Sequence, residues 1–255
     1  IPDISGAMVA MDPYTGRVFS MVGGFSFDQS EFYRASQALR QPGSSFKPFV
    51  FATALDNGYT PSSSILDEPV SIQQADGTYW TPENFEGGHG TGAHPLDHGV
   101  VHSKNMMTVR LAKDVGMPLV AEYAKRFGIY DEMPAYLSFA LGAGETTLMK
   151  MVTGYSMLAN GGKRIKPTLI DRVQDRWGKT IFRHDERQCL GCDAAKWDNQ
   201  NEPKLIDKRE QVLDPLTAYQ ITNIMEHVIQ RGTGVSIKSV GKHLAGKTGT
   251  TNDAK

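Results

Sequence analysis

The sequence has 255 residues, is almost neutral, and is moderately hydrophobic. It holds 27 Lys and Arg residues against 28 Asp and Glu, giving a net charge of −1, and 40% of its residues are hydrophobic. This balance gives no indication of nucleic acid or of a strongly charged partner. The length suits one large domain or two small ones, and no apolar run is long enough to cross a membrane.

The first predicted element is a β-hairpin. Two short apolar runs, residues 7–11 and 18–22, flank the turn-forming sequence Asp12-Pro13-Tyr14-Thr15-Gly16. Asp, Pro and Gly at these positions favour a tight reversal of the chain. Residues 25–43 are polar and irregular, and they lead directly to Ser44.

An apolar helix is predicted to begin at Ser44 and to end at Asn57-Gly58. Ser44 and Lys47 form an S-x-x-K motif, and this spacing places both residues on one face of the helix. A serine hydroxyl is a weak nucleophile, and a desolvated, neutral lysine can act as its base. Taken alone, the motif also fits a capping serine and a solvated lysine. A second S-x-x-K, Ser239–Lys242, has no helix after it.

The remaining chain is predicted to be mostly helical, with loops that hold short strands. Residues 58–93 form a long loop with short strands, such as residues 70–72, and loops of this length often carry function. Further helices are expected at 95–101, 107–115, 118–127, 146–159 and 215–230, and a hairpin pairs 168–173 with 180–182.

Two cysteines, Cys189 and Cys192, lie in a polar insertion at residues 184–212. No βαβ pattern surrounds this C-x-x-C, which disfavours a thioredoxin-like redox site. A zinc site would need two more ligands, and His184 supplies only one candidate. We therefore expect a local disulfide in an oxidising compartment.

Three histidines, His94, His98 and His102, are spaced four residues apart. Pro95 is expected to start the helix, so His94 lies outside it and only the other two share a face. No cluster of carboxylates completes a metal site. We therefore expect packing or solvated histidines and no metal.

Two further motifs follow the first S-x-x-K in the chain. Ser103-Lys104-Asn105 is S-x-N, and Lys247-Thr248-Gly249-Thr250 is K-T-G-T. Either one alone could be a helix cap or an edge strand that runs into a turn. Together and in this order, the three motifs resemble those of the penicillin-binding protein and serine β-lactamase superfamily.

Longer stretches of the sequence resemble one branch of this superfamily. They are similar to the transpeptidase domain of class A, bifunctional penicillin-binding proteins, above all to the 1A type of Gram-negative bacteria. The similar stretches are residues 32–49, 103–111, 142–162, 230–234 and 246–253.

The resemblance implies a role for each motif residue. Ser44 would form the acyl-enzyme, Lys47 would take its proton, and Lys247 would help to keep Lys47 neutral. Ser103 would relay a proton, and Asn105 would orient Lys47 and the substrate amide. The oxyanion hole would be formed by the N–H groups of Ser44 and Thr250. The substrate carboxylate would be bound by Lys247, Thr248 and Thr250, and Gly249 would let the substrate approach closely.

The implied fold is α/β, or α+β by stricter naming. It has an antiparallel sheet flanked by helices, with a strand at residues 244–251, and a mostly helical subdomain at 95–162. The family has two more strands and a final helix after this strand. We therefore expect residues 1–255 to be a C-terminally incomplete transpeptidase domain, completed by a further segment or a second chain.

The implied function is D,D-transpeptidation of peptidoglycan stem peptides that end in D-Ala-D-Ala, with β-lactams trapping Ser44 and with no metal or organic cofactor. An upstream glycosyltransferase domain and a membrane anchor are implied outside this chain, at the periplasmic face of the bacterial inner membrane. The alternatives are a β-lactam sensor, a D,D-carboxypeptidase and a β-lactamase. Class A β-lactamases carry S-D-N and a deacylating Glu, whereas Lys104 is the middle residue here, and Glu145 is followed by Met149 in place of an Asn.

Overall fold

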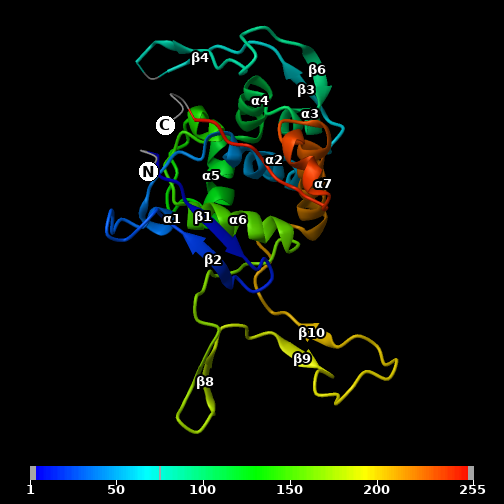
Figure 1. Cartoon of the computed structure of the whole chain (residues 1–255). Helices are drawn as coiled ribbons and strands as arrows, with labels where there is room; N and C mark the ends of the chain where they lie inside the picture. Colours follow the sequence, from blue (N-terminus) through cyan, green and yellow to red (C-terminus); the bar gives the residue numbers. More distant parts are fainter. Residues whose placement is uncertain (1–3, 75, 252–255) are drawn as a thin grey trace.

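The computed structural model describes residues 4–74 and 76–251, and its fold is mixed α and β. Figure 1 shows a body of helices gathered around α2 (Lys47–Asp56), with strands β3 to β6 above it. Below the body lies an extension of residues 172–206, called the arm here, which carries β7 to β10. The other α-helices are α1 (Arg34–Gln37), α3 (Leu96–Val101), α4 (Asn105–Val115), α5 (Met117–Arg126), α6 (Leu148–Ala159) and α7 (Pro215–Arg231). Short 3-10 helices are η1 (Gly43–Phe46), η2 (Leu137–Leu141) and η3 (Val235–Val240).

The strands form two-stranded antiparallel ladders. The pairs are β1 (Met8–Met11) with β2 (Val18–Val22), β3 (Ser64–Asp67) with β6 (Gly92–Pro95), β4 (Ile72–Gln73) with β5 (Tyr79–Trp80), β7 (Arg172–Gln174) with β8 (Thr180–Arg183), and β9 (Gln188–Leu190) with β10 (Lys204–Ile206). The two predicted hairpins, at the N-terminus and at residues 168–182, are confirmed.

Helix α2 is the centre of the hydrophobic core. Every residue from Lys47 to Leu55 is buried, because the helix is apolar on all sides and is covered by α4, α5 and α7. The Phe49 ring meets those of Phe127 and Tyr155 edge to face, with centroids 5.1 and 5.4 Å apart. Such aromatic contacts add to the energy of burial. The core therefore holds the start of α2, and with it Lys47, in a fixed place.

The predicted helices are present with small shifts of their ends. Pro95 was expected as the first residue of its helix, but it ends β6 and precedes α3, which begins at Leu96. Ser103 and Lys104 lie in the predicted connection between α3 and α4, but Asn105, which was also expected there, is the first residue of α4. None of the helices in the described part of the chain is long and apolar enough to span a bilayer.

The predicted strand at residues 244–251 is wrong for this structure. The segment carries no strand assignment and pairs with no strand among the described residues. A strand needs a neighbour for its backbone groups, and here the N–H of Gly246 donates to the carbonyl oxygen of Met225 in α7 at 3.2 Å. The end of the stretch Gly246–Asp253 and the terminal Lys255 lie outside the described residues.

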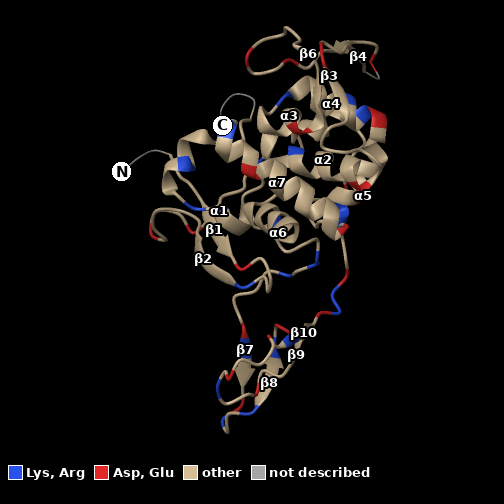
Figure 2. Cartoon of the chain, turned by 90° about the vertical axis from the view of Figure 1, so that its right-hand side faces the viewer, with Lys and Arg blue, Asp and Glu red and all other residues tan. Residues whose placement is uncertain are grey.

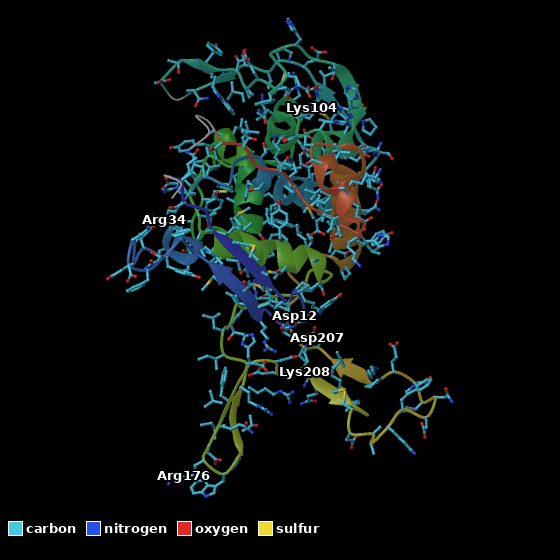
Figure 3. All side chains as sticks on the ribbon, in the orientation of Figure 1. Asp12, Arg34, Lys104, Arg176, Asp207 and Lys208 are labelled. Atoms are coloured by element: carbon cyan, nitrogen blue, oxygen red, sulfur yellow. A yellow bond between two sulfur atoms is a disulfide. The ribbon has the colours of Figure 1, made fainter. Side chains whose placement is uncertain are left out.

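The arm leaves the body beside the turn of the N-terminal hairpin. Figure 2 shows it as a narrow extension that carries β7 to β10. Figure 3 places Asp12 and Asp207 where the arm meets the body, and Arg176 at its far tip. The Arg209 guanidinium donates to the carbonyl oxygen of Tyr14 at 2.5 Å, which fixes the base of the arm to the hairpin.

Candidate active site

Ser44 lies in the 3-10 turn that leads into α2. Its side chain is partly exposed, and its hydroxyl makes no hydrogen bond within residues 4–74 and 76–251. The neighbouring Ser45 differs, because its hydroxyl donates to the carbonyl oxygen of Pro42 at 2.6 Å. Tyr155 braces the same turn by donating to the Ser45 carbonyl oxygen at 2.7 Å. Of the two adjacent serines, Ser44 is therefore the one with an available hydroxyl.

Lys47 lies one helical turn after Ser44 and is completely buried. Its Nζ atom lies 2.5 Å from the carbonyl oxygen of Ser103, 3.1 Å from Ser103 Oγ and 2.6 Å from Asn105 Oδ1. The Asn105 Nδ2 group donates to the Glu83 carbonyl oxygen at 2.7 Å, which turns the amide oxygen toward Lys47. Among the described residues, the S-x-N motif thus supplies every hydrogen bond of the Lys47 ammonium.

The backbone of Ser103 is strained. Its φ angle of +56° lies in the left-handed region, which costs a non-glycine residue about 1–2 kcal/mol. This conformation turns both the carbonyl oxygen and the hydroxyl of Ser103 toward Lys47. The middle residue of the motif, Lys104, is buried and its ammonium binds Glu86 at 2.5 Å.

The K-T-G-T segment lies along the turn that carries Ser44. A Cβ atom placed on Gly249 would lie only 3.2 Å from the Pro42 carbonyl oxygen, and one on Gly43 would collide with the Thr250 carbonyl oxygen. Gly43 has a φ angle of +53°, so both its conformation and this close approach favour glycine. The segment and the Ser44 turn therefore form two walls of one site.

Lys247 reaches across this site to the S-x-N motif. Its Nζ donates to Ser103 Oγ at 2.8 Å and to its neighbour's carbonyl oxygen, that of Thr248, at 3.0 Å. The hydroxyls of Thr248 and Thr233 are 2.7 Å apart. We did not predict Thr233 as a site residue, and the only sequence signal was its place in the stretch 230–234.

The two lysines have lowered pKa values. Burial, and then the positive charge of Lys247, hold the pKa of Lys47 well below its ordinary value. Burial lowers the pKa of Lys247 to about 8. In its neutral form Lys47 can accept a hydrogen bond from Ser103 Oγ, while the charged form of Lys247 donates to the same oxygen.

The structure therefore brings eight predicted residues to one place and leaves two elsewhere. The residues at the site are Ser44, Lys47, Ser103, Asn105, Lys247, Thr248, Gly249 and Thr250. Cys189 and Cys192 lie in the arm, where they form a disulfide. No distance relates the N–H groups of Ser44 and Thr250 to a bound group, so the oxyanion hole stays a prediction.

The three histidines stack on one another away from these contacts. The rings of His94 and His98 have centroids 4.1 Å apart, and those of His98 and His102 are 4.3 Å apart. His94 lies in β6, outside α3, as predicted. The described residues contain no group of three or more His, Cys, Asp or Glu side chains that could hold a metal ion.

Comparison with known proteins identifies the family. The chain belongs to the penicillin-binding protein transpeptidase domain family, whose model matches residues 6–255. It is 41% identical over 260 residues to penicillin-binding protein 1A of Rickettsia conorii, a match that covers 100% of this chain and 32% of that protein. The chain thus spans about a third of the length of the curated relatives that it matches.

Solved structures agree with the fold that the sequence implies. Penicillin-binding protein 1A of Haemophilus influenzae matches with a TM-score of 0.83 and 31% identity, over 98% of this chain and 40% of that one. The PonA1 protein of Mycobacterium tuberculosis, solved in complex with penicillin V, matches with a TM-score of 0.74 and 25% identity, over 96% of this chain and 61% of that one. The α/β fold of the penicillin-binding transpeptidases is confirmed.

Proposed function

We propose that this chain is a serine-type D,D-transpeptidase domain that cross-links peptidoglycan stem peptides. The observation that carries the proposal is the available hydroxyl of Ser44, one helical turn before a buried lysine whose pKa is well below its ordinary value. A neutral lysine in this position can activate a serine for acyl transfer. Lys47 would serve as this base, and the family match supports acyl transfer as the reaction class.

In the first half-reaction, Ser44 Oγ attacks the carbonyl carbon of the penultimate D-Ala and Lys47 takes the hydroxyl proton. The N–H groups of Ser44 and Thr250 stabilise the oxyanion, and donors of this kind contribute about 3–4 kcal/mol each. The C–N bond then breaks, and the proton travels from Lys47 through the Ser103 hydroxyl to the leaving amine. Free D-Ala departs and the acyl group stays on Ser44.

In the second half-reaction, an amine of a neighbouring stem peptide attacks the Ser44 ester. It loses a proton, Ser44 regains one, and the new amide bond is the cross-link. Before acylation, Lys247, Thr248 and Thr250 hold the terminal carboxylate of the donor peptide, which later leaves with D-Ala, and the ammonium of Lys247 supplies the charge for this contact. Gly249 keeps the wall of the site free of a side chain that would block the donor backbone.

β-Lactams are proposed to acylate the same serine. The related PonA1 protein has been solved with penicillin V, which supports β-lactam binding here. Slow release of the adduct is expected, because Glu145 has no Asn at its fourth following position to help activate a water. This disfavours a β-lactamase, while a D,D-carboxypeptidase would differ only in using water as acceptor.

The setting of the domain is also a proposal. The relatives are about three times longer than this chain, which leaves room for an upstream glycosyltransferase domain and a membrane anchor. The domain would then work at the periplasmic face of the inner membrane, where a disulfide between Cys189 and Cys192 can persist. Within it, residues 95–162 would act as the helical subdomain that carries Ser103 and Asn105.

The proposal is tested by incubating the full-length protein with a stem pentapeptide donor and an amine acceptor. The expected products are free D-Ala and a cross-linked peptide, both absent with Ser44→Ala. Release of D-Ala without cross-linked peptide would show a carboxypeptidase. A stable penicillin adduct without either product would show a sensor, and no reaction with any of these compounds would overturn acyl transfer.

A further inference from the structure

The loop of residues 83–86 contacts the S-x-N motif. Three of its groups bind the motif: the Glu83 carbonyl oxygen accepts from Asn105 Nδ2 at 2.7 Å, the Asn84 amide oxygen accepts from the Asn105 N–H at 2.8 Å, and Glu86 binds Lys104 at 2.5 Å. The contacting residues are 18 to 22 positions apart in the chain, so tertiary structure brings the loop and the motif together.

Asn84 caps helix α4 from outside that helix. Its Oδ1 atom accepts the N–H groups of Asn105 and Met106, at 2.8 and 3.3 Å, which are the first two residues of α4. The residue before the helix, Lys104, provides no side-chain cap. Loss of a helix cap destabilises the helix, and in this helix the cap also fixes the backbone of Asn105.

A buried carboxylate holds Asn84 in this orientation. Asp67 is fully buried, and its two oxygens accept from Asn84 Nδ2 at 2.8 Å and from Thr91 Oγ1 at 2.7 Å. Because a carboxylate only accepts hydrogen bonds, it turns the Asn84 amide so that the oxygen faces α4. The ammonium of Lys104 lies 3.7 Å from Asp67 and offsets its charge. Figure 3 shows Lys104 between α4 and the strands above it.

Asn105, which Asn84 and Glu83 hold, is itself bound to Lys47. Asn105 presents its Oδ1 atom to Lys47 at 2.6 Å, and the strained Ser103 backbone presents two more oxygens. A left-handed serine is kept in place only where its surroundings hold it. The N–H of Ser103 donates to the Val100 carbonyl oxygen at 3.2 Å, and the two lysines bind its oxygens. The cap on α4 and the hydrogen bond from Asn105 to Glu83 add to these contacts by fixing the residue two positions later.

We infer that Asp67 and Asn84 are positioning residues of the acyl-transfer site, which hold Asn105 and Ser103 in the arrangement that binds Lys47. The inference rests on the proposed acylation of Ser44. Neither side chain touches the nucleophile, and both act through the start of α4. Loss of the Asn84 amide should therefore slow acylation even in protein that remains folded.

The first test compares Asn84→Ala with Thr217→Val in the full-length protein. Thr217 is 5% exposed and donates to the Asp56 carboxylate at 2.8 Å, at the opposite end of α2 from Lys47, so its loss also removes a buried hydrogen bond. The measurement is the saturating rate constant of acylation by a fluorescent penicillin, per folded molecule, with the thermal midpoint recorded in parallel. Asn84→Ala is expected to lower the rate constant at least tenfold, and Thr217→Val less than twofold.

The second test exchanges the amide of Asn84, which donates, and the carboxylate of Asp67, which accepts, between the two positions. Asn84→Asp sets two carboxylates against each other and is expected to slow acylation at least tenfold at pH 8. Adding Asp67→Asn restores one donor and one acceptor between the two positions and should recover the rate to within threefold of wild type. This test keeps the inference open to refutation even if Asn84→Ala does not fold.

Each outcome bears on one claim. If wild type is acylated and Asn84→Ala or Asn84→Asp reacts at the wild-type rate, the positioning role is wrong. An equal loss in Thr217→Val, or no recovery in the exchanged pair, would also overturn it, since general destabilisation would then explain the result. If wild type itself is not acylated, the proposed function fails instead.

Discussion

Lys47 and Lys247 meet at a single hydroxyl. The Nζ atoms of the two lysines lie 3.1 and 2.8 Å from Ser103 Oγ, although the residues come from opposite ends of the chain. Two full positive charges this close to one oxygen would repel each other, and Lys247 indeed contributes to the lowered pKa of Lys47. The arrangement therefore favours one neutral and one charged lysine.

The first prediction is a bell-shaped dependence of acylation on pH. The rate should rise as Lys47 loses its proton, at a pH well below the ordinary lysine range, and fall as Lys247 loses its charge near pH 8. The fall follows from the proposed role of Lys247, because its neutral form would no longer attract the substrate carboxylate. The measurement is the second-order rate constant of acylation between pH 5 and 10.

Lys247→Arg provides the control for this assignment. Arginine keeps its charge throughout that range, so the decrease near pH 8 should move to higher pH even if the variant is slower overall. A decrease that stays near pH 8 in this variant would show that another group causes it.

The second prediction concerns Gly142, which packs on the Ser44 turn. Gly142 and Gly161 have nearly the same φ angles, +79° and +80°, so alanine at either position incurs a similar strain of about 1 kcal/mol. A Cβ atom on Gly142 would also collide with the Gly43 carbonyl oxygen, whereas one on Gly161 meets nothing within 4 Å.

We therefore expect Gly142→Ala to lower the thermal midpoint more than Gly161→Ala, and to slow acylation at least tenfold. Gly161→Ala should acylate within twofold of wild type. The measurements are thermal unfolding and penicillin labelling of both variants. Equal acylation rates in the two would mean that the Ser44 turn tolerates a shift at Gly142.

The third prediction concerns the histidine stack. Burial, and then the charges of His102, His94 and Lys104, lower the pKa of His98 to about 4, with Asp67 opposing. An unfolded histidine titrates near 6.5. Between these values the unfolded chain binds a proton that the folded chain does not, so the free energy of unfolding should fall as pH drops from about 6.5 to 4.

His98→Gln should reduce this pH dependence, and His243→Gln, at an exposed position, should leave it unchanged. Denaturant unfolding at several pH values between 4 and 7 measures both. The account of His98 would be wrong if the slope of stability against pH were the same in wild type and His98→Gln.

The fourth prediction is that the disulfide in the arm is not needed for acylation of Ser44. The disulfide between Cys189 and Cys192 closes a short loop in an arm that extends from the body (Figure 1). Closing so short a loop constrains the unfolded chain little. The double variant Cys189→Ser/Cys192→Ser should therefore acylate within twofold of wild type, while proteolysis within the arm becomes faster. A large loss of acylation would show that the arm supports the site.

Local patterns in the sequence were sufficient to predict most of the fold. The apolar run after Ser44, with its Asn57-Gly58 stop, predicted α2, and the turn residues at 12–16 predicted the N-terminal hairpin. The strand expected at residues 244–251 is absent from the structure, and the local sequence could not have shown this, because a strand forms only beside a neighbour that lies elsewhere in the chain. The local sequence describes one of the two paired strands and contains no information on its partner.

The site was predictable where its chemistry depends on short motifs. Ser44, Lys47, Ser103 and Lys247 each belong to one, and their order indicated that they meet. Asn84 was different, because its role depends on a hydrogen bond to α4 from a loop that has no motif of its own. The left-handed backbone of Ser103 was equally hidden, since nothing in the S-x-N sequence specifies a φ angle.

The most direct test of the central claim is the intact mass of the full-length protein after penicillin is added, followed over time in wild type, Ser44→Ala and Ser45→Ala. Ser45 is the matched control, because it is adjacent but its hydroxyl is already bound to Pro42. The account predicts one stoichiometric adduct that persists for many minutes in wild type and Ser45→Ala and is absent in Ser44→Ala. An adduct that persists in Ser44→Ala, or no adduct in folded wild-type protein, would contradict it.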